Sequence, residues 1–256
     1  MFKFIIGGRR RAGMTHRDYS QYAQLGHGGI VVSSPSKRID LYIQSHVIDA
    51  AYGTEQAGWY PGADFDSFSE LWFADPASMQ QELASDYYQS KIKPDEPRFT
   101  DSGRILVLGS QEEEQPVAAP RNGLLKVMRF LKRANGVSYS QFGDAWRRET
   151  ARIASHPALV DPLCRYVRSH ALEGAATAVG GADEQFVRGT PINVYDGVES
   201  LWFAAFDDLS IFNIYRKAVN EANSHIGELL DHRADIVALT EERQILPVER
   251  KGAMVA

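Results

Sequence analysis

The sequence predicts an α+β fold in which two ferredoxin-like units, each with the element order β-α-β-β-α-β, are fused in one chain. Two observations predict it: the chain repeats itself, and both copies show the same succession of local patterns. A length of 256 residues is sufficient for two small domains. We expect a first repeat over residues 1–110, a linker over 111–122, a second repeat over 123–247 and a tail over 248–256.

The repeat is visible as collinear matches whose spacing grows along the chain, as insertions in loops would produce. The matched positions are Lys3 with Lys126, Gly13 with Gly136, Tyr19 with Phe142, segment 42–46 (Tyr-Ile-Gln-Ser-His) with 166–170 (Tyr-Val-Arg-Ser-His), and segment 71–74 with 201–204 (both Leu-Trp-Phe-Ala). A shared Trp-Phe pair in the same order as the other matches indicates a duplication rather than chance.

Each copy opens with a strand and a helix. Apolar runs at 4–6 and 124–131 predict the first strands. Thr15 and Ser138 are helix N-cap residues, because each is a hydroxyl residue followed three positions later by an acid or amide side chain. The helices that follow carry apolar residues at helical spacing, which indicates one buried face.

The second part of each copy repeats this logic. Alternating or apolar segments predict second strands at 39–48 and 165–172, third strands at 68–73 and 198–203, and fourth strands at 104–108 and 236–239. Acidic helix starts, Asp75-Pro76 in one copy and Asp207-Asp208 in the other, follow the third strands. A four-stranded sheet with both helices on one face leaves its other face bare, and two such sheets can cover each other.

Three segments interrupt the pattern. Residues 111–120 are acidic, contain proline and lack periodicity, which is typical of an exposed linker. The loops at roughly 49–64 and 173–194 are long enough for functional lids, although disorder accounts equally well for the second. The tail after Pro247 is expected to fray or to form an arm.

Composition excludes several classes of protein. A net charge of -5 argues against a nucleic-acid binder, which would carry a basic excess. Cys164 is the single cysteine, so an internal disulfide and a multi-cysteine zinc site are impossible. No apolar run approaches the roughly 20 residues that span a bilayer, and the basic cluster follows the N-terminal apolar run instead of preceding it. We therefore expect a soluble cytoplasmic protein without a nucleic-acid or membrane partner.

Four motifs carry a resemblance to a known family. They are an aromatic-rich helix that ends near His27, a Tyr42-x-x-x-His46 strand, an Asp66-x-x-x-x-Leu71-Trp-Phe strand, and a closing Thr240-Glu-Glu-Arg243 segment. This set resembles the EthD domain of the dimeric α+β barrel superfamily, and two EthD-like copies would cover about 3–110 and 124–246. The resemblance implies a barrel completed within one chain, with a homodimer of such chains possible.

The resemblance leaves the activity open, because one fold hosts many functions. The superfamily includes cofactor-free decarboxylases, cyclases and monooxygenases of aromatic polyketides, muconolactone isomerases and haem-dependent enzymes. The shared feature that it implies is a pocket lined by aromatic residues, with one or two histidines or acids, that accepts planar phenol-like or lactone substrates.

Three histidines are candidates for catalysis. His27 occupies the place of the family's histidine, although it could equally cap the C-terminus of a helix. His46 and His170 occur in both copies four residues after a tyrosine, where they could serve a pocket or form a scaffold hydrogen bond. The second copy has Thr150 or Ala151 where the first has His27, so the two pockets are not expected to be equivalent.

The expected substrate-binding residues are Tyr22, Tyr42, Trp72, Arg129, Tyr166 and Trp202. Arg129 stands among apolar neighbours and needs a partner, which could be a substrate carboxylate or Glu199. The duplicated Trp72 and Trp202 fit a core role better than stacking on a substrate.

Elimination points to proton transfer without a cofactor. The chain lacks helical metal-ligand spacing, a glycine-rich phosphate loop and a Gly-x-Ser-x-Gly motif, so we expect neither a metal nor another cofactor. The favoured hypothesis is a cofactor-independent lyase, with decarboxylase as the preferred subtype, that acts on an aromatic or phenolic acid through a histidine. The alternatives are a cofactor-free or haem-dependent oxygenase, an isomerase or cyclase, and a non-catalytic small-molecule-binding accessory protein. The substrate and the active copy stay open.

Overall fold

The computed structural model describes most of the chain. The described residues are 1–48, 60–61, 65–101, 103, 105–123, 125–172, 186–187, 190–191, 195–204, 208–222, 226–231 and 236–246. The loops predicted at 49–64 and 173–194 and the tail after Pro247 lie almost entirely outside these residues. Within the described part of the chain, no helix is both long enough and apolar enough to cross a membrane.

The elements follow one another in the same order in the two halves. The first half contains β1 (Phe2–Gly8), α1 (His16–Gln21), the π-helix η1 (Tyr22–His27), α2 (Gly28–Val32), β2 (Leu41–Val47), β3 (Tyr60–Pro61), β4 (Ser67–Phe73), α3 (Pro76–Leu83), η3 (Tyr88–Ile92), η4 (Glu96–Arg98) and β5 (Leu106–Gln115). The second contains β6 (Leu125–Leu131), α4 (Tyr139–Ala154), β7 (Leu163–Ala171), β8 (Phe186–Val187), β9 (Thr190–Pro191), β10 (Gly197–Phe203), α6 (Asp208–Ala222), η5 (Gly227–Leu229) and β11 (Ile236–Leu246).

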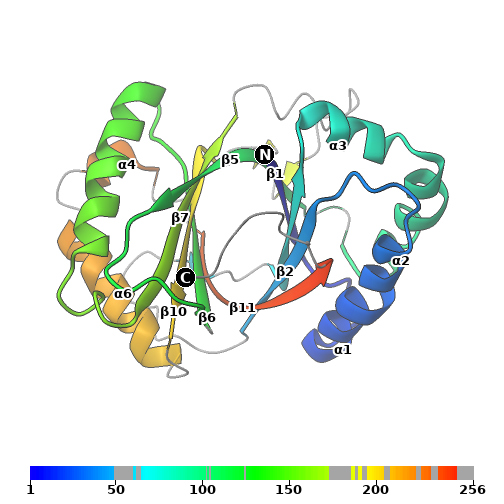
Figure 1. The fold of residues 1–256 in the computed structure, drawn as a ribbon, viewed down its shortest axis with the longest axis horizontal. Helices are drawn as coiled ribbons and strands as arrows, with labels where there is room; N and C mark the ends of the chain where they lie inside the picture. The colour runs from blue at the N-terminus through cyan, green and yellow to red at the C-terminus, as the bar shows by residue number, and fades with distance from the viewer. Residues whose placement is uncertain are drawn as a thin grey trace.

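Eight of these strands close into one barrel in the order β2-β4-β1-β5-β7-β10-β6-β11, with β11 pairing back to β2 (Figure 1). The pairings within the barrel are antiparallel. Two seams join the halves: β5 pairs with β7, and β11 pairs with β2. The helices of the first half lie on one side of the barrel and those of the second half on the other (Figure 1). The chain is thus a mixed α+β fold around a closed barrel, as the resemblance implied.

The barrel interior combines an apolar layer with a charged one. Side chains from both halves, among them Ile5, Phe68, Met128 and Phe130, form one buried apolar cluster. Beside this cluster, residues with the same register in β1 and β6 place two buried lysines against two tryptophans, Lys3 over Trp72 and Lys126 over Trp202.

A single carboxylate joins the two lysines. Glu70 of β4 lies 2.5 Å from the Nζ of Lys3 and 2.5 Å from the Nζ of Lys126, and it is fully buried. The matching residue in β10 is Ser200. Glu70 pairs with Ile5 of β1, and Ser200 pairs with Met128, which holds the same place in β6. The two lysines hold the pKa of Glu70 at about 2 even though burial alone would raise it.

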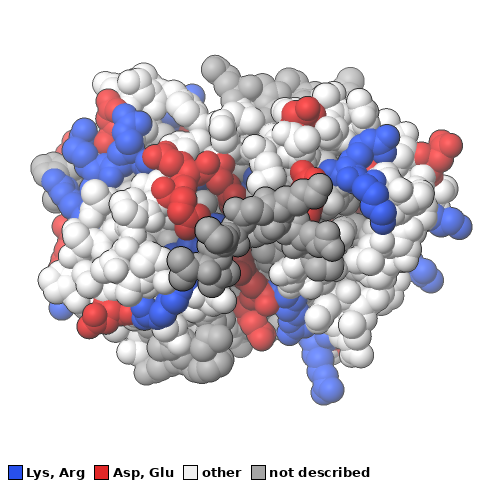
Figure 2. All heavy atoms as spheres, in the orientation of Figure 1, with Lys and Arg blue, Asp and Glu red and all other residues white. Residues whose placement is uncertain are grey.

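The predicted linker was wrong over residues 111–115, because β5 continues to Gln115 and pairs with β7. The acidic side chains are tolerated there since each meets a cation. Glu112 accepts from Lys3, Glu113 from Arg168 and Glu114 from Arg165. β11 likewise extends well past the predicted 236–239, to Leu246. Figure 2 shows acidic side chains gathered over the end of β5.

The helix starts agree with the predicted caps. The Thr15 hydroxyl accepts from the backbone N–H of Asp18, Asp75 caps α3 with proline at the first position, and Ser138 and Gln141 form a reciprocal capping box. The first helix differs from the prediction in one respect. It passes through a π-helical stretch, Tyr22–His27, that α4 lacks.

Candidate functional site

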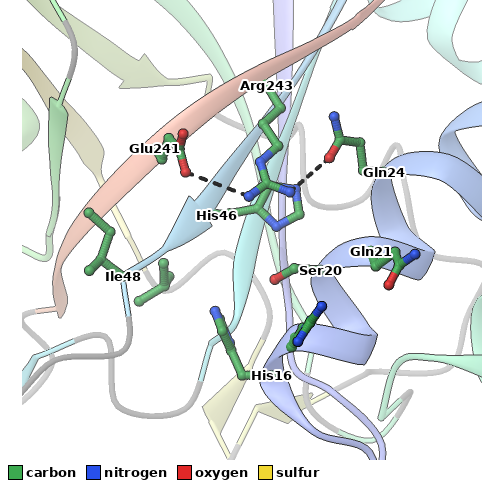
Figure 3. A pocket seen from close by; sticks show the side chains of 10 residues that line it. His16, Ser20, Gln21, Gln24, His46, Ile48, Glu241 and Arg243 are labelled. Carbon is green, nitrogen blue, oxygen red and sulfur yellow. Dashed lines mark hydrogen bonds and ion pairs between the residues drawn. The ribbon is translucent and has the colours of Figure 1, made fainter.

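A cavity of about 340 Å³ lies in the first half, between α1, β2 and the end of β11 (Figure 3). Its lining residues are His16, Arg17, Ser20, Gln21, Gln24, His46, Val47, Ile48, Glu241 and Arg243. The residues at 16, 20 and 24 lie one helical turn apart, so a single helix face supplies one wall. The other wall is built from both halves, because β11 of the second half pairs with β2 of the first.

Strand alternation brings His46 to this cavity. Tyr42, Gln44 and His46 share the face of β2 that packs against the helices, whereas Ser45 points into the barrel and bonds Glu70. Gln44 donates to the Ala23 carbonyl at 2.8 Å and to the Tyr42 hydroxyl at 2.7 Å. Alternation along the strand is enough to put these three side chains on one face, and the structure adds that this face meets the helix layer.

His46 is buried and only half satisfied. Its side chain is 3% exposed, and its Nε2 lies 2.9 Å from the Gln44 Oε1. Its Nδ1 is buried and lacks a hydrogen-bond partner within the described part of the protein. Burial, reinforced by the charges of Arg243 and His16, lowers the pKa of His46 to about 3. The imidazole is therefore neutral at physiological pH and can accept a proton or a hydrogen bond.

A second imidazole, His16, enters the cavity from the first turn of α1. Its Nδ1 lies 2.9 Å from the Oδ1 of Asp66, and Asp66 is itself held by the side chain and the backbone N–H of Arg10. Ser20, one turn further along α1, contributes a buried hydroxyl without a hydrogen-bond partner among the described residues. The cavity thus holds two imidazoles and one hydroxyl.

Arg243 supplies the positive charge. It comes from β11 and donates to the Gln24 Oε1 at 2.7 Å, while Glu241 lies 3.6 Å from its other terminal nitrogen. Figure 3 shows Arg243 and His46 together, across the cavity from His16 and Ser20. A guanidinium in this place can stabilise an oxyanion or a carboxylate of a ligand.

Among the described residues, an indole packs beside the matching histidine of the second half. The Trp146 indole lies 4.7 Å, between ring centroids, from the imidazole of His170. Gly197 makes room for it, since a Cβ at that position would collide with the indole. The first half has Ala23 at the helix position of Trp146, four residues after the matched pair Tyr19 and Phe142.

Ion pairs complete this closure. His170 and Arg168 both contact the Oε2 of Glu113, at 3.2 Å and 2.8 Å. Arg168 stands where β2 has Gln44, and Glu113 stands where β11 has Arg243. The pair Gln44 and Arg243 is thus replaced in the second half by Arg168 and Glu113, whose charges neutralise each other. The two halves are not equivalent at this level.

His27 lies in a cluster outside the cavity lining. Its Nδ1 is 3.0 Å from the Oδ2 of Asp95, Tyr22 donates to the other carboxylate oxygen at 2.7 Å, and Phe99 packs on the ring. Burial lowers the pKa of His27 against the opposing effect of Asp95. His27 and His46, both expected to be catalytic, therefore belong to different side-chain clusters.

Arg129 and Tyr166 take part in a buried network of the second half. Arg129 lies 3.1 Å from Glu149 and 3.6 Å from Glu199, and Tyr166 donates to Glu199 at 2.8 Å. Of the two roles that the sequence allowed for Arg129, the structure provides the ion pair with Glu199.

The other predicted binding residues lie inside the barrel or behind the cavity. Trp72 and Trp202 donate to Glu112 and Glu242 and carry a lysine on their rings. Tyr42 is buried behind the cavity, where it supports Gln44. None of these three residues is among the described residues that line the cavity.

Three residues of the site were missed by the sequence analysis. His16 was hidden in the capping sequence after Thr15, where polar residues need no further explanation. Arg243 and Asp66 stood inside the motifs that carried the family resemblance but were not singled out. The usable signal was the asymmetry of the repeat: the second half has Tyr139 in place of His16 and Glu113 in place of Arg243.

Comparison with known families bears on this half of the molecule, since residues 11–103 match the EthD domain. The match includes His16 of α1, His46 of β2 and Asp66 just before β4, whereas Arg243 lies outside the matched residues, in the other half of the chain. No curated protein sequence matches the chain significantly.

Solved structures share the fold over the whole length at low identity. An anthrone oxidase-like protein superposes with a TM-score of 0.63 at 8% identity, covering 100% of this chain and 96% of its own. Chlorite dismutase from Candidatus Nitrospira defluvii, in complex with imidazole, has a TM-score of 0.50 at 10% identity, covering 94% and 90%. At such identity the two structures establish the fold alone.

The described residues do not fit a haem. A haem requires a broad apolar slot beside an axial ligand, whereas charged or amide side chains make up much of the lining of the first-half cavity, and Trp146 with its ion-paired neighbours fills the equivalent space by His170. Within the described part of the chain, no three His, Cys, Asp or Glu side chains are grouped to share a metal ion. The cavity is better suited to a small organic ligand that carries polar groups. Its described lining contains no Phe, Tyr or Trp, which differs from the aromatic lining that the resemblance implied.

Proposed function

We propose that this protein is an enzyme that transfers protons without a cofactor, with its active site in the first-half cavity. The observation that carries the proposal is the buried, neutral His46, whose Nδ1 has no partner among the described residues, beside the Arg243 guanidinium. Perturbed titratable groups in a cavity are typical of functional sites. Asp66 accepts a hydrogen bond from the Nδ1–H of His16, which leaves the Nε2 of this second imidazole free to exchange a proton with a ligand.

The reaction that these groups fit best is the decarboxylation of an aromatic or phenolic acid. An imidazole as weak as His46 takes a proton only if the negative charge left on the substrate is stabilised, and Arg243 provides that stabilisation. His46 takes the phenolic proton through Nδ1 and returns it to the product, while the imidazolium form of His16, bonded to Asp66 through Nδ1–H, delivers its Nε2 proton to the ring carbon that bears the carboxylate. The C–C bond then breaks, its electron pair returns to the ring and carbon dioxide leaves.

A cofactor-free oxygenase is the second candidate. The likeness to an anthrone oxidase-like protein favours it, and the same proton acceptor would serve it by forming an electron-rich phenolate. The two reactions differ in their need for dioxygen, so anaerobic assays separate them.

The test is turnover of hydroxybenzoic, hydroxycinnamic and hydroxynaphthoic acids, with carbon dioxide release and oxygen consumption both measured. His46→Gln and His16→Gln are expected to lower kcat by about 10²- to 10⁴-fold, the usual loss of a general base or acid. His170→Gln is the matched control from the closed half and is expected to leave turnover unchanged. Equal rates in all four proteins would refute the proposal.

Two further aspects belong to this proposal. The matching element order and strand registers support the interpretation of the halves as duplicated ferredoxin-like, EthD-like units, of which the first extends to Gln115. A cytoplasmic location and a homodimer of such chains stay predictions from the sequence.

A further inference from the structure

The orientation of the Gln44 side-chain amide is determined by its neighbours. Gln44 is buried, and its Nε2 donates to the Ala23 carbonyl at 2.8 Å. A backbone carbonyl can only accept, so the amide nitrogen must face Ala23 and the amide oxygen must face the other way. The Tyr42 hydroxyl, 2.7 Å from the same nitrogen, accepts the second proton.

This orientation settles the tautomer of His46. The Gln44 Oε1 faces the His46 Nε2 at 2.9 Å, and an amide oxygen only accepts. The proton of the neutral imidazole must therefore lie on Nε2. Its Nδ1 then carries a lone pair and no hydrogen, so it can accept a hydrogen bond but cannot donate one.

One atom of the cavity wall, the Nδ1 of His46, therefore needs a hydrogen-bond donor. The His46 Nδ1 is buried without a partner among the described residues, and a buried acceptor left unpaired costs about 1–3 kcal/mol. A ligand O–H or N–H directed at Nδ1 would supply the missing hydrogen bond. A carboxylate would not, because its oxygen lone pairs would face the lone pair of Nδ1 and repel it. Ser20, across the cavity, does not discriminate because its hydroxyl can donate or accept.

We infer that Gln44 is a positioning residue that fixes His46 in the Nε2–H tautomer, so that the cavity selects ligands that donate a hydrogen bond to Nδ1. The inference deepens the proposed function, on which it rests for the identity of the site. It assigns the ligand a hydroxyl at His46 and leaves any carboxylate to Arg243. The second half has Arg168, which only donates, at the place of Gln44, so this device is confined to the open cavity.

The first test is the side-chain ¹⁵N NMR spectrum of the histidines at neutral pH, which distinguishes protonated from bare ring nitrogens. His46 is expected to show a bare Nδ1 and a protonated Nε2. Gln44→Glu keeps an acceptor at Nε2 and should preserve this pattern, while Gln44→Leu should give a mixture of tautomers. Gln24→Leu, which removes a cavity amide that contacts Arg243 instead, should change nothing. A proton on Nδ1 in the unmodified protein overturns the inference, whichever variants fold.

The second test uses three matched ligands: 1-naphthol, 1-methoxynaphthalene and 1-naphthoate. The naphthol is expected to bind about tenfold more tightly than the ether, the value of one hydrogen bond, and to shift the Nδ1 resonance of His46. The naphthoate should leave that resonance in place. The inference fails if the naphthol has no advantage over the ether, including the case in which neither binds, or if the naphthoate shifts Nδ1 equally. These readouts need no turnover, so they separate this inference from the proposed function.

Discussion

His46 combines two properties that a histidine shows only when its surroundings impose them. It is buried beside a cation, which keeps it neutral, and it is bonded through one nitrogen, which leaves the other for a ligand. The first property follows from the meeting of β2 with β11, and the second from Gln44. A histidine at the same place in β7 has different neighbours and therefore different chemistry.

The low pKa of His46 has a measurable effect on stability. The pKa is about 3 in the folded protein, against 6.5 for an unperturbed histidine, so between these values the unfolded chain binds one more proton. Stability should therefore fall as the pH drops from 6.5 towards 3, with a contribution from His46 of up to about 1.4 kcal/mol per pH unit.

Urea unfolding at several pH values checks this expectation. His46→Gln should lower the slope of unfolding free energy against pH in that range. Other histidines, His27 and His170 among them, also have lowered pKa values and keep part of the slope in the variant. An identical slope in the variant would show that folding does not lower the pKa of His46.

At the scale of elements, the closure of the second half depends on the fit of α4 against β10. Trp146 donates to Glu199 at 2.6 Å and covers His170, and Gly197 is the position that admits it. A strand residue with any side chain at 197 would push the indole away. The position of the Trp146 indole on α4 therefore depends on the glycine at position 197 of β10.

Gly197→Ala tests this fit. The added methyl overlaps the indole, and overpacking of this kind costs about 1–3 kcal/mol in unfolding free energy. Gly143 lies on α4, the helix that carries Trp146, and has open space around it, so Gly143→Ala should instead stabilise the protein by about 0.5–1 kcal/mol. Denaturant titrations of both variants provide the comparison; equal effects would mean that α4 moves freely against the sheet.

Elements set by local chemistry were predictable from the sequence, and elements set by distant partners were not. Caps at Thr15, Asp75 and Ser138 depend on residues three positions away, so the helix starts were correct. The end of β5 depends on partners from Lys3 to Arg168, which a local pattern cannot reveal.

The same distinction applies to the site. Alternation along β2 is a local property of the sequence, and it is enough to put His46 on the same face as Gln44. The cation beside it comes from the far end of the chain, and whether a cavity is open depends on the side chain that a separate helix puts over it. Those facts follow from the packing of α1 and β11 on β2 and not from any single segment.

At the scale of the whole molecule, the barrel is a joint product of the two halves. The β5–β7 and β11–β2 seams close it, and the buried carboxylate of Glu70 connects Lys3 of one half with Lys126 of the other. Glu112 and Glu242 neutralise the outer side of each lysine. This arrangement satisfies buried charges that would otherwise be strongly destabilising.

Glu70→Leu should lower the unfolding free energy by about 3 kcal/mol or more, because two buried ammonium groups lose their shared partner. Ser200→Ala is the matched change at the same register in β10. Its hydroxyl has no hydrogen-bond partner among the described residues, so the substitution should have almost no effect. Thermal and urea unfolding of both variants decide the matter; a Glu70→Leu protein as stable as the unmodified one would show that the lysines are neutral or hydrated.

That single glutamate also says something about why the halves benefit from being covalently joined. In an assembly of two identical chains, a carboxylate at this place would appear twice, and two negative groups would compete for the space between the lysines. One continuous polypeptide can carry the acid once. The same freedom lets one half keep a cavity for a ligand while, in the other half, an indole packs beside the matching histidine.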